Sequence, residues 1–433
     1  MPVNLIKLSI PIFLGLVGVE LIALWVLRRP YIRLNDSIAD LACGILSQLA
    51  DIFTKGVQIF FFYLVWQHLR LQHLGLPELP LDHATHGWVW AAVTWSVGFV
   101  LIDLAYYWYH RTAHEVNFFW AVSHIVHHQS EEYNLTVALR QSAFGGFVSW
   151  LFYLPIALLG FPWEVFATCY ALNLIYQFWI HTRLIGRMPR WFEAVMNTPS
   201  HHRVHHGRNP KYIDKNYAGV FIVWDRLFGT YQPEEDEPAY GLTKPLRSWN
   251  PLWANLHAIW DLFTDAWRTR RWADKLRVFY MPPGYKPPDL GGPGPHGGVL
   301  APPYVDRSTQ TLFNPPVVLG VRAYVLLQFA AIVAVALPLF GYSYREQPLE
   351  VGVGVFFVTL TLVNLGGLLE NRRWAYLSDL ARLATACVAA LWLLVADPAQ
   401  WFTPAVGVLG LAALSGLWLL RLEKRLGEPV QVA

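Results

Sequence analysis

The sequence predicts an all-α integral membrane protein that crosses the bilayer about nine times. Hydrophobic residues make up 55% of the 433 residues and charged residues only 15%, well below the roughly 25% of a soluble domain. Several stretches carry about 20 apolar residues, which is the length of a helix that spans a bilayer. The net charge of +3 is small and the basic residues lie between these stretches, so a nucleic-acid partner is not expected.

Nine apolar segments are predicted to span the membrane. Their ranges are 8–27, 42–66, 88–109, 143–160, 162–180, 317–340, 351–370, 377–396 and 403–420. The second of them contains Asp51 and Lys55. The N-terminus lacks the basic start and small-residue cleavage site of a secretory signal, so 8–27 is interpreted as a retained span.

The basic residues predict the orientation of the chain. They follow the first, fifth, seventh and ninth segments, as Arg28, Arg29 and Arg33, Arg183, Arg187 and Arg190, Arg372 and Arg373, and Arg421, Lys424 and Arg425. The opposite loops, 341–350 and 397–402, carry little positive charge. By the positive-inside rule the N-terminus lies outside and the C-terminus in the cytoplasm. The membrane is expected to be the endoplasmic reticulum in a eukaryote, or the inner membrane in a bacterium.

Three regions follow from the composition. Residues 1–281 form a membrane domain, 282–316 form a Pro/Gly-rich linker expected to hold no regular structure, and 317–433 form four spans without histidine. Residues 251–271 mix Trp, Leu and Phe with charges at helical spacing. Such a helix is predicted to lie flat in the membrane interface.

The chemistry-bearing residues are histidines in three clusters. Positions i, i+3 and i+4 share one face of a helix, so each cluster points its imidazoles in one direction. Imidazole is a common ligand of iron and zinc, and eight ligands are too many for one ion, so two ions are predicted. The clustered residues are His110 and His114, then His124, His127 and His128, then His202, His205 and His206. His181, after the fifth segment, is a ninth candidate, and His201 is left open between a ligand and a solvent-facing residue.

Two acidic residues accompany the first cluster. Asp103 shares a helical face with His110 and His114, and Glu115 follows directly. Either carboxylate is suited to orient a ligand imidazole through its other N–H, although Glu115 has the alternative of a solvated residue. Before the third cluster, Thr198 or Ser200 is expected to cap a helix and Pro199 to begin it.

A histidine-rich pair of irons suits the activation of O2 for attack on an unreactive C–H bond. A site at the edge of the membrane implies a lipid substrate that enters from the bilayer. Zinc hydrolysis is the competing chemistry, but it normally uses three ligands and an open position and leaves most of these histidines unexplained. A metal transporter is the alternative outside enzymes, and it places ionisable groups at mid-span, whereas these histidines lie at the ends of spans.

With these motifs, the chain resembles the fatty acid hydroxylase/sterol desaturase superfamily of integral-membrane di-iron enzymes. The resemblance rests on YYWYHRTAHEVNFFWAVSHIVHHQSEEYNLTVALRQS (106–142), YQFWIHT (176–182), NTPSHHRVHHGRNPKYIDKNYAGVFIVWDRLFGT (197–230) and YGLTKP (240–245). EEYNLTVALRQS and NTPSHHRVHHGRN resemble the branch that cleaves glyceryl ethers. The span layout is similar over nearly the whole chain, with residues 1–281 as the hydroxylase-type catalytic domain, while the last four spans match in general character.

The resemblance implies a monooxygenase with two irons that uses O2 and tetrahydrobiopterin. It implies hydroxylation of the ether-bearing carbon of an alkylglycerol, after which the hemiacetal collapses to a fatty aldehyde and a glycerol. The eight clustered histidines carry over as iron ligands and Glu115 as a residue needed for activity. Within the superfamily, a hydroxylase or desaturase of sterols, carotenoids or fatty acyl chains is the alternative, and another electron donor is possible.

Polar residues next to the second cluster are candidates for the cofactor or the lipid head group. They are Glu132, Asn134, Arg140 and Gln141, together with Glu131. A glycerol head group and a pterin ring both need hydrogen-bonding partners, whereas a sterol or an acyl chain needs few. The alternative is that these residues pair with one another or cap a helix.

Overall fold

A computed structural model describes residues 5–79, 87–341 and 347–423 of the chain. It confirms an all-α membrane protein. Within the described residues, seven helices are long and apolar enough to cross a bilayer. The chain divides into two compact units, and each is described by itself. The first comprises Met1–Leu246 and Asn255–Thr311, and the second Arg247–Ala254 and Leu312–Ala433.

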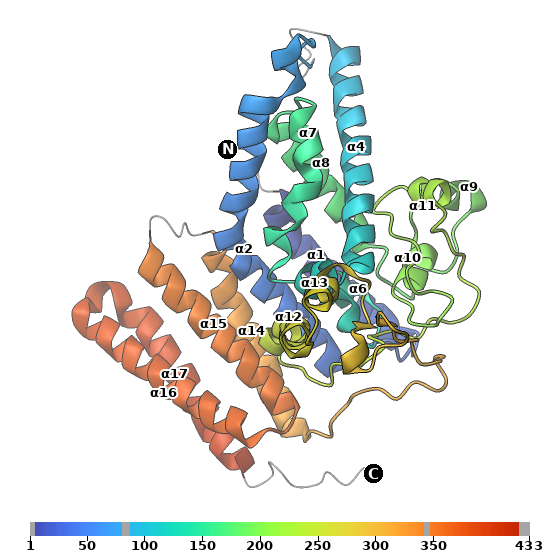
Figure 1. Ribbon diagram of the computed structural model, residues 1–433. Helices are drawn as coiled ribbons and strands as arrows, with labels where there is room; N and C mark the ends of the chain where they lie inside the picture. The colour runs from blue at the N-terminus through green and yellow to red at the C-terminus, as the bar shows by residue number, and fades with distance from the viewer. Residues whose placement is uncertain (1–4, 80–86, 342–346, 424–433) are drawn as a thin grey trace. The chain divides into compact units, whose positions relative to one another are not determined.

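Three long helices frame the first unit: α1 (Leu5–Val26), α2 (Leu34–Leu69) and α4 (Trp88–Glu115). In Figure 1, the first histidine-bearing segment is the lower end of α4. Shorter green helices lie between the upper halves of α2 and α4. These are η5 (Ser149–Tyr153), α7 (Leu154–Leu158) and α8 (Trp163–Phe178). Their apolar side chains form one buried cluster with α2 and α4 that includes Phe62, Ile102 and Phe166. This packing fixes the end of α4, where the first histidines lie.

The predicted spans 143–160 and 162–180 differ from the expectation, so the count of nine is not confirmed. Residues 143–160 are broken into η4 (Gly145–Phe147), η5 and α7, and α8 has only 16 residues. Together they form a hairpin whose tip is held by the far end of α2, where Trp66 Nε1 donates to the carbonyl of Gly160 at 3.2 Å. Gly160 has φ +90°, a conformation that glycine adopts without strain. The segment reverses there because Pro162 follows and cannot continue a helix.

The segments that carry the histidines are short. After α4 come α5 (Asn117–Phe119), a single π-helical turn η2 (Trp120–His124), η3 (His127–Gln129) and α6 (Leu135–Ala138). Beyond α8 come α9 (Arg190–Glu193), α10 (Pro199–His205) and α11 (Val223–Phe228). Two further short helices of this unit are η1 (Leu71–Leu74) and η6 (Pro288–Leu290).

The Pro/Gly-rich segment is more ordered than the sequence suggests. It follows α12 (Pro251–Arg268) and α13 (Trp272–Tyr280). The expectation that 282–316 holds no regular structure is wrong for its first part, where β1 (Tyr285–Lys286) pairs with β2 (Gly298–Val299) in an antiparallel arrangement. Tyr285 is buried against α12 and α13 in a small apolar cluster. Residues up to Thr311 therefore belong to the first unit.

The second unit contains four long helices. They are α14 (Leu319–Leu339), α15 (Pro348–Leu369), α16 (Arg373–Ala396) and α17 (Pro398–Leu422). Its interior is not wholly apolar. Arg382 of α16 donates to Asp379 at 2.6 Å and to Gln328 of α14 at 2.9 Å, and Gln328 donates to Ser415 of α17 at 2.6 Å. Pairing of this kind is what permits buried polar groups inside membrane helices.

Candidate metal centre

The first histidine pair lies on the last turns of α4. His110 and His114 are four residues apart, so their rings share one face of the helix, and both are buried. The ring of His110 is held from outside the helix, because its Nδ1 lies 2.6 Å from the carbonyl oxygen of Tyr217. A carbonyl only accepts hydrogen bonds, so Nδ1 carries the proton and Nε2 presents its lone pair.

The second cluster does not lie on a regular α-helix. His124 closes the π turn η2, and His127 and His128 begin η3 after two further residues. The turn changes the direction of the rings. His124 and His128 face the α4 histidines, with His124 Nε2 at 2.8 Å from His110 Nε2. His127 faces the opposite way, with its Nδ1 at 3.0 Å from the carbonyl of Arg140.

The third cluster lies on α10, a helix of seven residues. This helix begins where the sequence predicts, with Thr198 as the extended N-cap residue and Pro199 as the first helical residue. The side chain of Thr198 makes no capping hydrogen bond. His202 and His206 face His127, while His205 faces the α4 histidines. His205 Nδ1 lies 3.0 Å from the carbonyl of Lys215, which again leaves its Nε2 unprotonated.

His181, just after α8, completes the arrangement. Its Nδ1 lies 2.8 Å from the carbonyl of Gln177, and its Nε2 lies 3.2 Å from His127 Nε2 and 3.0 Å from His202 Nε2. The structure thus brings all nine predicted histidines together in two groups, and in each group the ligand atoms lie within 4.8 Å of one another. The five-histidine group is His110, His114, His124, His128 and His205, and the four-histidine group is His127, His181, His202 and His206. His201 is buried but belongs to neither group.

Each group fits a metal ion. His127 and His181 both donate their Nδ1 protons to carbonyls, so two Nε2 lone pairs face each other at 3.2 Å, and a cation between them would remove the repulsion. Two nitrogens that bind one ion side by side at about 2.1 Å stand about 3 Å apart. In the described residues, the buried Nε2 atoms of His114, His205 and His206 have no hydrogen-bond partner. Such atoms are rare unless a ligand satisfies them.

Burial also favours the protonation state that binds metal. It lowers the pKa of His127 to about 4 and the pKa values of His205 and His206 well below the usual range, and neighbouring imidazoles add to the effect on His205 and His206. The neutral ring is the form that acts as a ligand.

Comparison with known proteins places this site in a family. The family model for fatty acid hydroxylase matches residues 95–230, which contain all nine histidines. An alkylglycerol monooxygenase from Homo sapiens is 37% identical over 87% of this chain and 80% of its own length. Those from Xenopus tropicalis and Danio rerio are 38% and 39% identical over 87% and 84% of this chain, and 79% and 77% of their own lengths. The chain belongs to the alkylglycerol monooxygenase family. No solved structure matches it. The family and the histidine groups together indicate an enzyme, a monooxygenase with a metal site.

Asp103 does not orient an imidazole in this family member, contrary to the expectation from its helical face. The carboxylate is fully buried and accepts four hydrogen bonds within the described residues, none from a histidine. Its donors are the backbone N–H groups of Val220 and Phe221 at 2.8 and 3.0 Å, Trp224 Nε1 and Asn173 Nδ2. It therefore fixes the loop that ends at Phe221 against α4. The loop also contains Tyr217, whose carbonyl holds His110.

Glu115 lies at the rim of the five-histidine group. It accepts a hydrogen bond from Arg111 Nε at 2.9 Å and one from the Tyr217 hydroxyl at 3.4 Å, and its side chain is 40% exposed. Within the described part of the chain, the carboxylate of Asp214 lies beside a ligand ring, at 3.7 Å from His114 Nδ1, and sequence reasoning missed it. Spacing gave no signal for Asp214, because it approaches from a loop one hundred residues later.

The four residues predicted to contact a cofactor are engaged with the protein. Asn134 caps α6 by accepting from Thr136 N–H at 3.0 Å, and Arg140 pairs with Asp40 of α2 at 3.1 Å. Gln141 is exposed and donates to the carbonyl of Ala138. These contacts match the alternative interpretation of pairing and capping, and the cofactor role stays a prediction.

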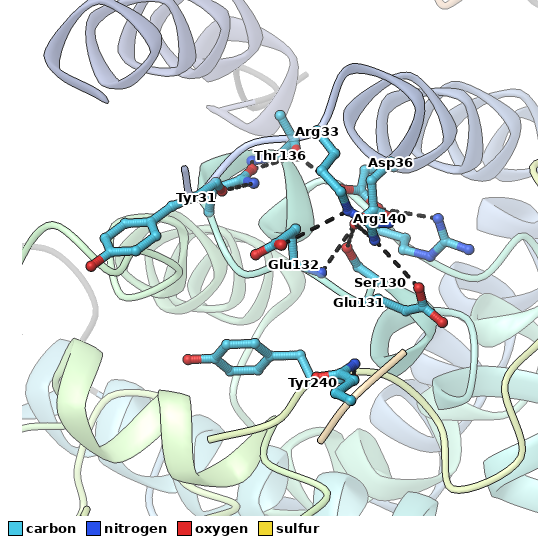
Figure 2. A network of polar contacts seen from close by, with 12 residues as sticks. Tyr31, Arg33, Asp36, Ser130, Glu131, Glu132, Thr136, Arg140 and Tyr240 are labelled. Atoms are coloured by element: carbon cyan, nitrogen blue, oxygen red, sulfur yellow. Dashed lines mark hydrogen bonds and ion pairs between the residues drawn. The ribbon is translucent and has the colours of Figure 1, made fainter. Parts of the chain in front are cut away.

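Glu132 is the centre of a buried ionic network. Figure 2 shows Arg33 among Asp36, Glu131 and Glu132, with the ring of Tyr240 nearby. Arg33 Nη2 lies 3.1 Å from Asp36 and 3.4 Å from Glu131. Asp36 also accepts from Ser130 Oγ and from the backbone N–H of Glu132, each at 3.0 Å. The start of α2 thus anchors the loop that follows His128.

Proposed function

We propose that the chain is a membrane di-iron monooxygenase that cleaves the ether bond of alkylglycerols, with tetrahydrobiopterin as the reductant. One observation carries the proposal: nine buried histidines converge in a five-nitrogen and a four-nitrogen group at the end of an apolar helix, in a chain whose relatives are alkylglycerol monooxygenases. The resemblance implies iron and the pterin. The five-histidine group is proposed to hold one iron and the four-histidine group the other.

The bound irons would supply the activation of O2. One oxygen atom enters the C–H bond of the ether-bearing carbon, and the other leaves as water with two electrons and two protons from the reductant. The resulting hemiacetal breaks its C–O bond to give a fatty aldehyde and a free glycerol hydroxyl. Both iron groups are proposed to lie on the cytoplasmic face, and the alkyl chain to enter from the bilayer.

The protein's part is to hold and shield the irons. The carbonyls of Tyr217 and Lys215 keep His110 and His205 in the metal-binding tautomer. Tyr133 stacks on His181 with ring centroids 5.7 Å apart and contacts His206 at 5.2 Å, so its ring excludes water from one side of the four-histidine group. Glu115, at the exposed rim, is proposed to act on bound substrate rather than on an iron.

The test is a reconstitution. Purified protein loaded with Fe²⁺ in lipid vesicles, given O2, tetrahydrobiopterin and an alkylglycerol, is expected to release a fatty aldehyde and to consume O2. The His205→Ala variant, inserted in the same vesicles, is the matched control and should release none. An iron-loaded protein that ignores alkylglycerol and oxidises a sterol or a fatty acid would overturn the substrate. A protein that binds no iron and transports metal ions would overturn the enzyme.

A further inference from the structure

We propose that Arg307 and Glu132 form an ionic clamp that holds residues 305–310, here called the strap, over the four-histidine group. Both residues then act as positioning residues for the ion of that group. The proposal rests on the proposed function in one respect, namely that this group binds an ion. The strap belongs to the segment that the sequence presents as a linker.

The clamp is an ion pair between the buried carboxylate of Glu132 and the partly buried guanidinium of Arg307, which donates through both of its Nη atoms. Arg307 Nη2 lies 2.8 Å from both carboxylate oxygens of Glu132, and Glu132 is only 2% exposed. Arg307 Nη1 also donates to the carbonyl of Glu131 at 3.1 Å. Contacts between a guanidinium and a carboxylate are strong and fix the relative orientation of both groups.

Glu132 lies in one histidine-bearing segment and joins it to a second such segment and to the start of α2. It lies four residues after His128 in the chain. Arg183, two residues after His181, donates to Glu132 at 3.4 Å, and Arg33, just before α2, lies 3.8 Å from it. A single carboxylate therefore ties the loops of two histidine-bearing segments to α2 and to the strap. Loss of its charge would remove the carboxylate that three guanidinium groups share, while Arg33 would keep Asp36 and Glu131 and Arg183 would keep Glu237 as partners.

The strap covers the site through two layers of tyrosine. Tyr133 packs on His181 and His206, and Tyr240 stacks on Tyr133 with ring centroids 5.0 Å apart. Gln310 of the strap then donates to the backbone carbonyl of Tyr240 at 2.6 Å. The order from the metal group outward is histidine, Tyr133, Tyr240 and strap. Releasing the strap would loosen both rings and admit water to the ligands.

The first test measures the strap without any metal. Tyr304 precedes the strap and is 79% exposed, so chymotrypsin cleavage at Tyr304 reports how firmly the strap is held. We expect Arg307→Ala to be cleaved at least about tenfold faster than the wild-type chain in the same detergent. Arg271→Ala is the matched control, because Arg271 also pairs with a buried aspartate, Asp274, and in the described residues it contacts no ligand histidine. Equal cleavage of Arg307→Ala and wild type would overturn the clamp.

The second test measures the ion. The release of Fe²⁺ to a chelator should become about 10- to 100-fold faster for one of two ions in Arg307→Ala, the range seen when a residue that supports a metal ligand is removed. The double variant with His181→Ala should hold no fewer ions than His181→Ala alone, and the double variant with His110→Ala should hold one ion that is released at the faster rate. Arg307→Lys keeps the charge but loses the second nitrogen that donates to the carbonyl of Glu131. It should be intermediate, and it replaces Arg307→Ala if that chain does not fold.

The two failures are distinguishable. If the wild-type chain holds only one ion or none, the proposed function fails. The cleavage test still measures whether the clamp holds the strap. If the wild-type chain holds two ions and both Arg307 variants release them at the wild-type rate, the positioning role of Arg307 is wrong.

Discussion

His127 and His128 are neighbours in the chain, but their imidazoles belong to different histidine groups. Their ring centroids lie 5.5 Å apart and the ring planes are nearly perpendicular, at 89°. Successive residues diverge by about 120° in a 3₁₀-helix such as η3 and by about 100° in an α-helix, so adjacent histidines are suited to serve two ions. The third cluster repeats the arrangement, with His205 in one group and His206 in the other. Each H-x2-H-H motif thus contributes ligands to both groups.

The first prediction follows from this partition. His128→Ala and His127→Ala should each reduce the iron content from two ions per chain to about one, and both should abolish turnover. His201→Ala is the control, because His201 is buried beside the third cluster but lies outside both groups, and it should keep two ions. Elemental analysis of iron-loaded, purified chains gives the counts. Variants of His127 and His128 that both retain two ions would contradict the partition.

The second prediction concerns Asp103. Replacing it by Asn puts an amide N–H where the carboxylate accepts from backbone N–H groups, so a buried donor loses its partner. We expect Asp103→Asn to lower the free energy of unfolding by roughly 3 kcal/mol. Chains that remain folded should bind two irons with a wild-type substrate preference. Thermal unfolding in detergent measures the loss. A variant of wild-type stability that fails to bind iron would instead support a role at the metal.

The third prediction concerns Glu115. Its carboxylate contacts Arg111 and Tyr217 but, among the described residues, no ligand histidine. Glu115→Ala should therefore lower kcat at least about tenfold while both irons remain bound. Asp214→Asn provides the comparison, because Asp214 lies beside His114 and its loss should weaken iron binding. Iron loss in Glu115→Ala, or full activity, would contradict this assignment.

The fourth prediction tests the orientation in the membrane. In a chain without its three native cysteines, Ser308→Cys should react with an impermeant thiol reagent from the cytoplasmic side and Glu350→Cys from the other side. Both positions are exposed, whereas residues 342–346 of the predicted outer loop lie outside the described residues. The hairpin of residues 143–178 does not alter the expected sides. Its two arms run in opposite directions, so the chain leaves the hairpin on the side where it entered. Labelling of both cysteines from one side would contradict the topology.

The fifth prediction concerns α12, which was predicted to lie flat in the interface. One stripe of this helix is exposed and apolar, with Trp260, Phe263 and Trp267 at helical spacing, while Leu262 on the other face is buried. Aromatic residues of this kind favour the level of the lipid head groups. An environment-sensitive dye at Phe263→Cys should shift to the blue on reconstitution, and the same dye at exposed Asp261→Cys should not. Equal emission at both positions would contradict an interfacial helix.

The sequence by itself determined the class of the protein and the identity of its metal-site candidates. Apolar segments of bilayer length predict the long helices because a buried backbone must satisfy its hydrogen bonds within the segment. The spacing of His110 and His114 predicts one shared face because the helix period is fixed. Pro199 predicted the start of α10 because its fixed φ suits a first helical residue. These are local properties, and each is readable from a few neighbouring residues.

Only the tertiary structure decided how the histidines are shared and what holds them. The carbonyls of Tyr217 and Lys215 carry no sequence signal, since every residue has a carbonyl, and only the fold brings them to His110 and His205. The helix period predicts the face on which Asp103 lies, but not the groups that its carboxylate contacts. One of them, the backbone N–H of Phe221, belongs to a loop more than one hundred residues later in the chain. Arg307 lies in a segment whose composition predicts a linker, but it forms an ion pair with the buried carboxylate of Glu132. The cause is common to all three: the partner is distant in sequence, and long-range contacts depend on how the whole chain packs.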